Sequence, residues 1–131
     1  MPFHVWLPAA HPVAPSPVSA LMSGVVIKTG IYGLLRLLSW LPDLPIGCAI
    51  GLMTVSLLTG VMGILYALGQ HQIKRMLAYS SVENIGIIGL AISVALLGRS
   101  LQQPVLVVFG LGGALLHVLN HALFKGLLFL S

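Results

Sequence analysis

The chain has 131 residues, of which 58% are hydrophobic and only 6% are charged, and its mean hydropathy is +1.08. In a soluble domain of this length about a quarter of the residues are charged. The charged residues of this chain are too few to cover the surface of a globular domain in water. The composition therefore excludes an ordinary soluble domain and predicts an integral membrane protein, in contact with the lipid bilayer.

The net charge of +4 comes from six basic residues and two acidic ones. The basic residues are spread along the chain and some lie inside apolar runs, so they form no footprint for a nucleic acid. Cys48 is the single cysteine, which excludes a disulfide within the chain.

Five prolines mark the N-terminal stretch, at positions 2, 8, 12, 15 and 17. They predict that no regular helix runs through residues 1–16, whereas Pro17 suits the first turn of a following helix. The stretch lacks the basic region and continuous apolar core of a signal peptide. Two interpretations remain: an interfacial loop anchored by Trp6, or the end of a broken helix of the kind that transporters use at ion sites.

Four apolar stretches follow, each long enough for the ~20 residues that a helix needs to cross a bilayer. None alternates with a period of two residues, so a β-barrel is excluded, and the backbone must satisfy its hydrogen bonds within helices. The sequence therefore predicts an all-α, polytopic membrane fold with about four transmembrane helices, over about 17–41, 45–69, 75–98 and 104–131. Neither end carries a cap or polar tail, so we expect an internal fragment of a longer protein.

Glycines recur within these predicted helices, and small residues let membrane helices approach closely. We expect packing at Gly47 with Gly51, Gly60 with Gly63, Gly86 with Gly89, and Gly110 with Gly112 and Gly113. The polar run "QHQIKR" is predicted to form the second loop, which holds the adjacent Lys74 and Arg75 on the same side as the N-terminal stretch. The excess of positive charge in cytoplasmic loops predicts that this side faces the cytoplasm.

Lys28 falls deep in the first predicted helix. It lies thirteen residues beyond Pro15, which is roughly 20 Å along a helix, near the middle of the bilayer. A lysine there costs a few kcal/mol and is by default a candidate functional residue, although a structural ion pair is the alternative. Burial disfavours the charged form of a lysine, so such a group can exchange a proton. Tyr32, four residues later, could add a hydroxyl to the path.

The run "HVLNHALFK" places His117, His121 and Lys125 at intervals of four residues. This spacing puts them on one helix face over roughly 12 Å, with Asn120 beside them. Two histidines four residues apart can share a metal ion, but no carboxylate or cysteine lies nearby in sequence. Imidazole accepts a proton on one nitrogen and releases one from the other near neutral pH. The pattern therefore favours a proton relay over a metal site.

Glu83 has two interpretations. With Ser80 it matches the S-x-x-E capping box of a helix N-terminus. Alternatively, the helix begins earlier, near Ile73, and Glu83 enters the membrane as a carboxylate partner for a buried lysine.

Three segments together resemble one known family: "WLPAAHPVAPSPVSALMSGVVIKTGIYGLLR", "QIKRMLAYSSVENIG" and "HVLNHALFKGLLFL". The chain is similar to the proton-translocating antiporter-like membrane subunits. That family includes the large membrane subunits of respiratory complex I, the Mrp-type antiporters, and the membrane subunit of formate hydrogenlyase and hydrogenase-4. "SALMSGV" and "SVENIG" are most similar to the hydrogenase-associated members.

The resemblance implies roles for these residues. Lys28 matches the lysine that links half-channels in the middle of the membrane, and His117, His121 and Lys125 match the central hydrophilic axis. Beyond the resemblance, we expect Glu83 and Tyr32 to be secondary members of the same relay. Family members are longer, with inverted repeats, and their paired upstream glutamate and lysine are absent here.

The implied function is proton translocation through the membrane arm of a redox-driven complex, of the hydrogenase, formate hydrogenlyase or NADH-quinone oxidoreductase type. The chain would not be catalytic by itself, and we expect no cofactor and no metal within it. Its partners would be other membrane subunits and a peripheral redox arm, in the cell membrane. The alternatives are a structural membrane anchor of such a complex and a subunit of an Mrp-type Na⁺/H⁺ antiporter.

Overall fold

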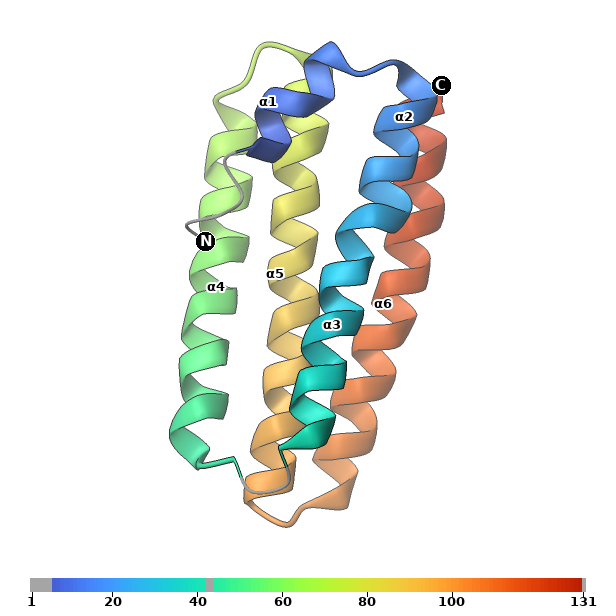
Figure 1. Ribbon diagram of the computed structural model, residues 1–131. Coiled ribbons are helices and arrows are strands. Elements are labelled where there is room, and N and C mark those ends of the chain that lie inside the picture. The colour runs from blue at the N-terminus through green and yellow to red at the C-terminus, as the bar shows by residue number, and fades with distance from the viewer. Residues whose placement is uncertain (1–5, 42–43, 131) are drawn as a thin grey trace.

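A computed structural model describes residues 6–41 and 44–130, and every regular element among them is a helix (Figure 1). In chain order the elements are α1 (Trp6–Val13), α2 (Ser16–Leu21), the π-helix η1 (Met22–Val26), α3 (Ile27–Trp40), α4 (Ile46–Leu68), α5 (Ile73–Ser100) and α6 (Pro104–Leu130). Pro2 and the predicted helix end at residue 131 lie outside the described residues.

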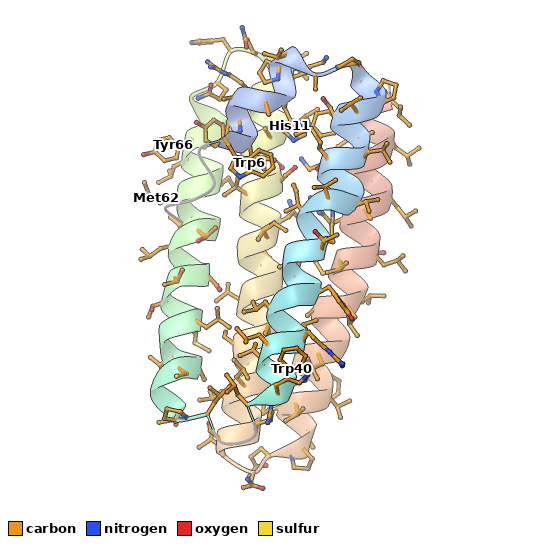
Figure 2. The ribbon with its side chains drawn as sticks, in the orientation of Figure 1. Trp6, His11, Trp40, Met62 and Tyr66 are labelled. Atoms are coloured by element: carbon orange, nitrogen blue, oxygen red, sulfur yellow. The ribbon has the colours of Figure 1, made fainter. Side chains whose placement is uncertain are left out.

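Four helical spans are long and apolar enough to cross a membrane. The first is Ser16–Trp40, in which α2, η1 and α3 follow one another without a break, and the others are α4, α5 and α6. The prediction of an all-α fold with four spans is thus confirmed. Trp6 and Trp40 are exposed near opposite ends of the bundle (Figure 2), as expected of tryptophans at the two membrane interfaces.

The prediction that prolines prevent a regular helix in the N-terminal stretch is wrong for Trp6–Val13, which form α1. Pro8 falls in the first turn, where a backbone N–H has no partner in any case. Pro12 is the next-to-last residue, so its missing donor costs at most one bond. The helix then breaks, and Pro15 is the N-cap of α2 with an extended ψ of 151°. Pro17 lies in the first turn of α2, as predicted.

Helix α5 lies at the centre of the bundle, between α4 on one side and α3 and α6 on the other (Figure 1). In the apolar part of α5, 61% of the span is buried within the bundle, against 28% or less in the other three spans. Ile88 and Ile92 of α5 form the core with Ile31 of α3 and Ala114 of α6. The helices that bear the candidate site residues are therefore organised around α5.

Glycines set the distance between α4 and α5. A Cβ on Gly86 would lie 2.5 Å from the backbone nitrogen of Gly60, and one on Gly63 would lie 2.7 Å from that of Glu83. On the other side of α5, a Cβ on Gly110 of α6 would lie 2.6 Å from the nitrogen of Ala95. Close packing is thus confirmed at these positions and at Gly89. It is not seen at Gly47, Gly51, Gly112 and Gly113, which have nothing within 4 Å among the described residues.

Arg99, near the end of α5, ties this helix to α3. Its guanidinium donates hydrogen bonds of 3.2 Å to the carbonyl oxygens of Leu38 and Leu41. The last carbonyls of a helix have no partner within it, and a positive charge is favourable at that end. Arg99 therefore caps α3 from a neighbouring helix.

Candidate functional site

The π-helix η1 presents Lys28 to the interior. Its wide turn spans Met22–Val26, just before Lys28, and such turns within α-helices are frequent at functional sites. The Nζ of Lys28 donates a hydrogen bond to the carbonyl oxygen of Ser23, five residues earlier. Lys28 is half-buried. Its hydrogen bond to Ser23 means that the backbone of its own helical span holds the ammonium group.

Two buried serines connect this lysine to α5 and α6. The hydroxyls of Ser23 and Ser81 are 2.8 Å apart, and both side chains are fully buried. Ser81 donates to the carbonyl oxygen of Leu77 at 3.0 Å. The Nζ of Lys125 donates to that same oxygen at 2.9 Å. Hydrogen bonds, together with the covalent backbone of Ser23, therefore link Lys28 to Lys125.

The last two members of the stripe on α6 face the interior. His121 is 0% exposed and Lys125 is 1% exposed, so a histidine and a lysine are enclosed at membrane depth. The rings of His117 and His121 are nearly parallel, with centroids 6.5 Å apart and planes inclined by 4°. The three titratable residues thus share one face of α6, as their spacing predicts.

The first member of the stripe is tied to α5. The Nε2 of His117 lies 2.9 Å from the Oδ1 of Asn84, and the amide of Asn84 donates to the carbonyl oxygen of Ser80 at 2.7 Å. With the Asn84 oxygen as acceptor, His117 donates from Nε2. Asn120 is exposed on the outer side of α6, so it does not join this network.

His121 is different from His117, because neither of its ring nitrogens has a hydrogen-bond partner among the described residues. The ring makes an edge contact with Phe124 at 5.3 Å between centroids. Buried polar atoms in proteins are nearly always bonded to protein or water. The unpartnered nitrogens of His121 are therefore available to exchange a proton with water or with a neighbouring group.

A second buried histidine lies at the end of the stripe. His11 is 0% exposed, reaches from α1 into the bundle (Figure 2) and stacks on Phe129 of α6 at 4.8 Å between centroids. Both of its ring nitrogens also lack partners among the described residues. Burial lowers the pKa of His11 below its usual value, and the positive charges of Lys125 and Lys74 lower it further.

The two secondary residues are placed differently. Ser80 and Glu83 lie well inside α5, whose N-cap is Gln72, so the capping-box interpretation of Glu83 is wrong. Glu83 is half-buried and its carboxylate attracts the ammonium of Lys125, although no direct ion pair joins them in the described part of the chain. Tyr32 is 69% exposed on α3, away from the bonds between Lys28 and Ser23.

Sequence reasoning missed four residues of this site: Ser23, Ser81, Asn84 and His11. Each becomes significant only through a partner on another helix, which spacing along one helix does not reveal. A usable signal was present for His11, since it is a histidine at the end of a segment otherwise rich in proline and apolar residues. Among the described residues no group of three or more His, Cys, Asp or Glu side chains could hold a metal ion.

Comparison with known proteins bears on this arrangement of helices and buried charges. A family model described as "NADH:quinone oxidoreductase/Mrp antiporter, TM" matches residues 1–131. The chain belongs to this family. It is 56% identical to the hydrogenase-4 component B of Escherichia coli, 45% identical to formate hydrogenlyase subunit 3 of the same organism, and 42% identical to an NAD(P)H-quinone oxidoreductase chain 4 of Thermosynechococcus vestitus.

These matches cover 98–100% of the chain but only 20–22% of each relative. The chain therefore spans about a fifth of the length of the curated relatives it matches. As a member of the antiporter-like family with four spans, it is a multi-pass membrane protein. The resemblance noted from its three motifs is confirmed, including the similarity to hydrogenase-associated members.

Proposed function

We propose that this chain forms a segment of a proton path through the membrane arm of a redox-driven complex. Lys28 and Lys125 are its two exchangeable ammonium groups, and His121 and His117 continue the path along α6. The observation that carries the proposal is the set of hydrogen bonds from Lys28 through Ser23, Ser81 and Leu77 to Lys125.

The backbone carbonyl oxygens and the serine hydroxyls of this connection have different roles. The carbonyl oxygens of Ser23 and Leu77 accept hydrogen bonds and hold the two ammonium groups in place. The hydroxyls of Ser23 and Ser81 can each accept one proton while donating another. The serine pair can therefore pass a proton across its own two hydroxyls, and bridging water would carry that proton to and from the ammonium groups.

Electrostatics favours one proton at a time. The positive charges of Lys28 and Lys125 act on each other at membrane depth, and like charges in a medium of low dielectric constant oppose simultaneous ionisation. Loss of a proton from Lys125 therefore favours protonation of Lys28, and the reverse also holds. Such alternation is what a stepwise path requires.

The histidines extend the path away from Lys125. The centroids of His117 and His121 are 6.5 Å apart, too far for a direct hydrogen bond and compatible with one bridging water. His117 is fixed by Asn84, whereas His121 has free ring nitrogens. We assign His121 the exchange step and His117 the role of a fixed neighbour that continues the relay, with Glu83 stabilising the charged form of Lys125. Tyr32 remains a proposed secondary member.

The relatives are named as parts of hydrogenase-4, formate hydrogenlyase and NAD(P)H-quinone oxidoreductase. We therefore propose other membrane subunits and a peripheral redox arm as partners, in the cell membrane. The family description also names Mrp antiporters, so an Mrp-type exchanger without a redox arm is the second candidate. Proton flux that continues in the absence of electron transfer, driven by a sodium gradient, would favour that second candidate.

The proposal is tested on Lys28 in the full-length protein, within its assembled complex in vesicles. Replacement of Lys28 by Ala removes the exchangeable group, and Arg keeps a positive charge that does not release its proton at physiological pH. We expect both variants to lower proton flux per electron by about a hundredfold with unchanged amounts of complex. Thr29→Val, at an exposed neighbouring position, is the control. Normal flux in Lys28→Arg would make Lys28 a fixed charge and overturn the proposal.

The serine pair has its own test, because Ser81→Ala removes one hydroxyl and leaves both lysines in place. We expect proton flux to fall by about tenfold while electron transfer continues. Ser39→Ala, which removes an exposed hydroxyl bonded within its own helix, serves as the control. Equal flux in both variants would mean that protons pass between the lysines by another route.

A further inference from the structure

Lys125 lies between two buried imidazoles. His121 is one turn before it on α6, and Phe129, one turn after it, carries the stacked ring of His11 from α1. Both histidines are fully enclosed, and neither has a partner for either ring nitrogen among the described residues. His11 thus continues the α6 stripe by one turn, although it comes from another element.

Two hydrogen bonds hold the end of α1 in this position. The hydroxyl of Ser19 in α2 donates to the carbonyl oxygen of His11 at 3.3 Å. The ammonium of Lys74 in α5 donates to the carbonyl oxygen of Ala14 at 3.1 Å. Since α2 and α5 both fasten this short helix, its histidine is placed by the fold and not by chance packing of a loop.

The location connects the interior to one end of the molecule. Helix α1 lies at the end where α2 begins, where α4 connects to α5 and where α6 finishes (Figure 1). The connection between α4 and α5 exposes His71 and Gln72. Among the residues that the structure describes, His11 is therefore a buried titratable group between Lys125 and this polar end.

The charges around His11 keep its ring neutral at rest. Lys125 faces it from α6 and Lys74 from α5, and burial adds to their effect, so its pKa lies below the usual value. The side chain that α2 contributes here, Ser19, carries no charge. An imidazole whose pKa is lowered from its usual value is neutral at physiological pH and binds a proton only transiently. When Lys125 loses its proton, the repulsion falls and protonation of His11 becomes easier.

We propose that His11 is the terminal proton-exchange group of the path, passing protons between Lys125 and the water at the end of the bundle formed by α1 and the connection between α4 and α5. A proton leaves the ammonium of Lys125 and binds the unprotonated ring nitrogen of His11. The other ring nitrogen releases its proton to water, which leaves a neutral lysine and a neutral imidazole. The reverse sequence loads Lys125. This inference rests on the proposed function.

The test uses the full-length protein in its assembled complex, reconstituted in vesicles, with proton flux per electron as the readout. His11→Phe keeps an aromatic ring to stack on Phe129 but cannot carry a proton. We expect a loss of flux of about tenfold or more with unchanged assembly and electron transfer. His71→Phe, which removes an exposed histidine at the same end of the molecule, should leave flux unchanged.

A second variant separates proton exchange from packing. His11→Ala opens space for a small buffer, so added imidazole should restore flux in His11→Ala and have no effect on His11→Phe. Normal flux in His11→Phe, or an Ala variant that imidazole does not restore, would overturn the inference. Loss of assembly in both variants would do so too, since the ring would then serve packing. If Lys28→Arg pumps normally, the proposed function itself fails. If Lys28→Arg is impaired but the His11 variants pump normally, the proposed function stands and the path ends at a group other than His11.

Discussion

His117 and His121 differ in their surroundings although they lie one turn apart on the same helix. His117 is fixed by a hydrogen bond to Asn84, whereas the ring nitrogens of His121 have no partner in the described part of the chain. The spacing of His117, His121 and Lys125 predicted a shared face. It could not predict this difference, because Asn84 lies on another helix, 33 residues away in sequence.

If the two histidines serve one path, their substitutions should be strongly non-additive, because breaking either link interrupts the same flow. We expect His121→Ala to remove most of the proton flux per electron, and addition of His117→Ala to lower it little further. The measurement is flux in vesicles, normalised to assembled complex, for both single variants and the double variant. Losses that add, together with falling amounts of complex, would indicate that the stripe serves packing.

At the scale of elements, α5 is held against α4 by backbone contact. The sequence predicted the third span at 75–98, and the structure extends it to Ile73–Ser100. Glu83 lies inside both the predicted and the observed helix, where its backbone packs against Gly63. The recurring glycines predicted close packing correctly where two helices meet, but a single sequence does not show which glycines meet one another. For that reason Gly60, Gly63 and Gly86 could not be told from Gly47 and Gly51.

Gly86→Ala should destabilise the protein, because the new methyl group would lie 2.5 Å from the backbone of Gly60. Overpacking of this kind costs about 1–3 kcal/mol, and here the obstacle is backbone that cannot rotate away. Gly51→Ala is the matched control: nothing lies within 4 Å of its methyl position in the described residues, and alanine favours a helix. Thermal unfolding of the full-length protein in detergent measures both. A Gly86→Ala variant as stable as the control would mean that α4 and α5 are farther apart than described.

At the scale of the whole molecule, composition and four apolar runs were sufficient to predict the class of fold and the number of spans. The hydrogen bonds that lie between Lys28 and Lys125 were not predictable in the same way, since they depend on how three helical spans meet. The two ends of the bundle are distinct: one carries α1, Lys74 and the connection between α4 and α5, and the other carries the capping contact of Arg99 with α3.

The charge pattern assigns these ends to the two sides of the membrane. Lys74 and Arg75 beside the connection between α4 and α5 predict that this end faces the cytoplasm. A cysteine placed at the exposed Gln72 in the full-length protein should therefore react with a membrane-impermeant reagent only from the cytoplasmic side. Labelling only from outside would reverse the orientation, and with it the side of the membrane on which we propose that His11 exchanges protons.

The π-helix before Lys28 shifts the helical phase within the first span. Its wide turn, spanning Met22–Val26, holds one residue more than an α-helical turn, so the faces of α2 and α3 are out of phase with a single helical wheel. Counting back by four from Lys28 leads to Gly24, yet its ammonium binds the carbonyl oxygen of Ser23, five residues back. Deletion of one residue between Met22 and Val26 would restore the α-helical phase. It would also turn α2, and α1 with its histidine, by about 100° relative to Lys28.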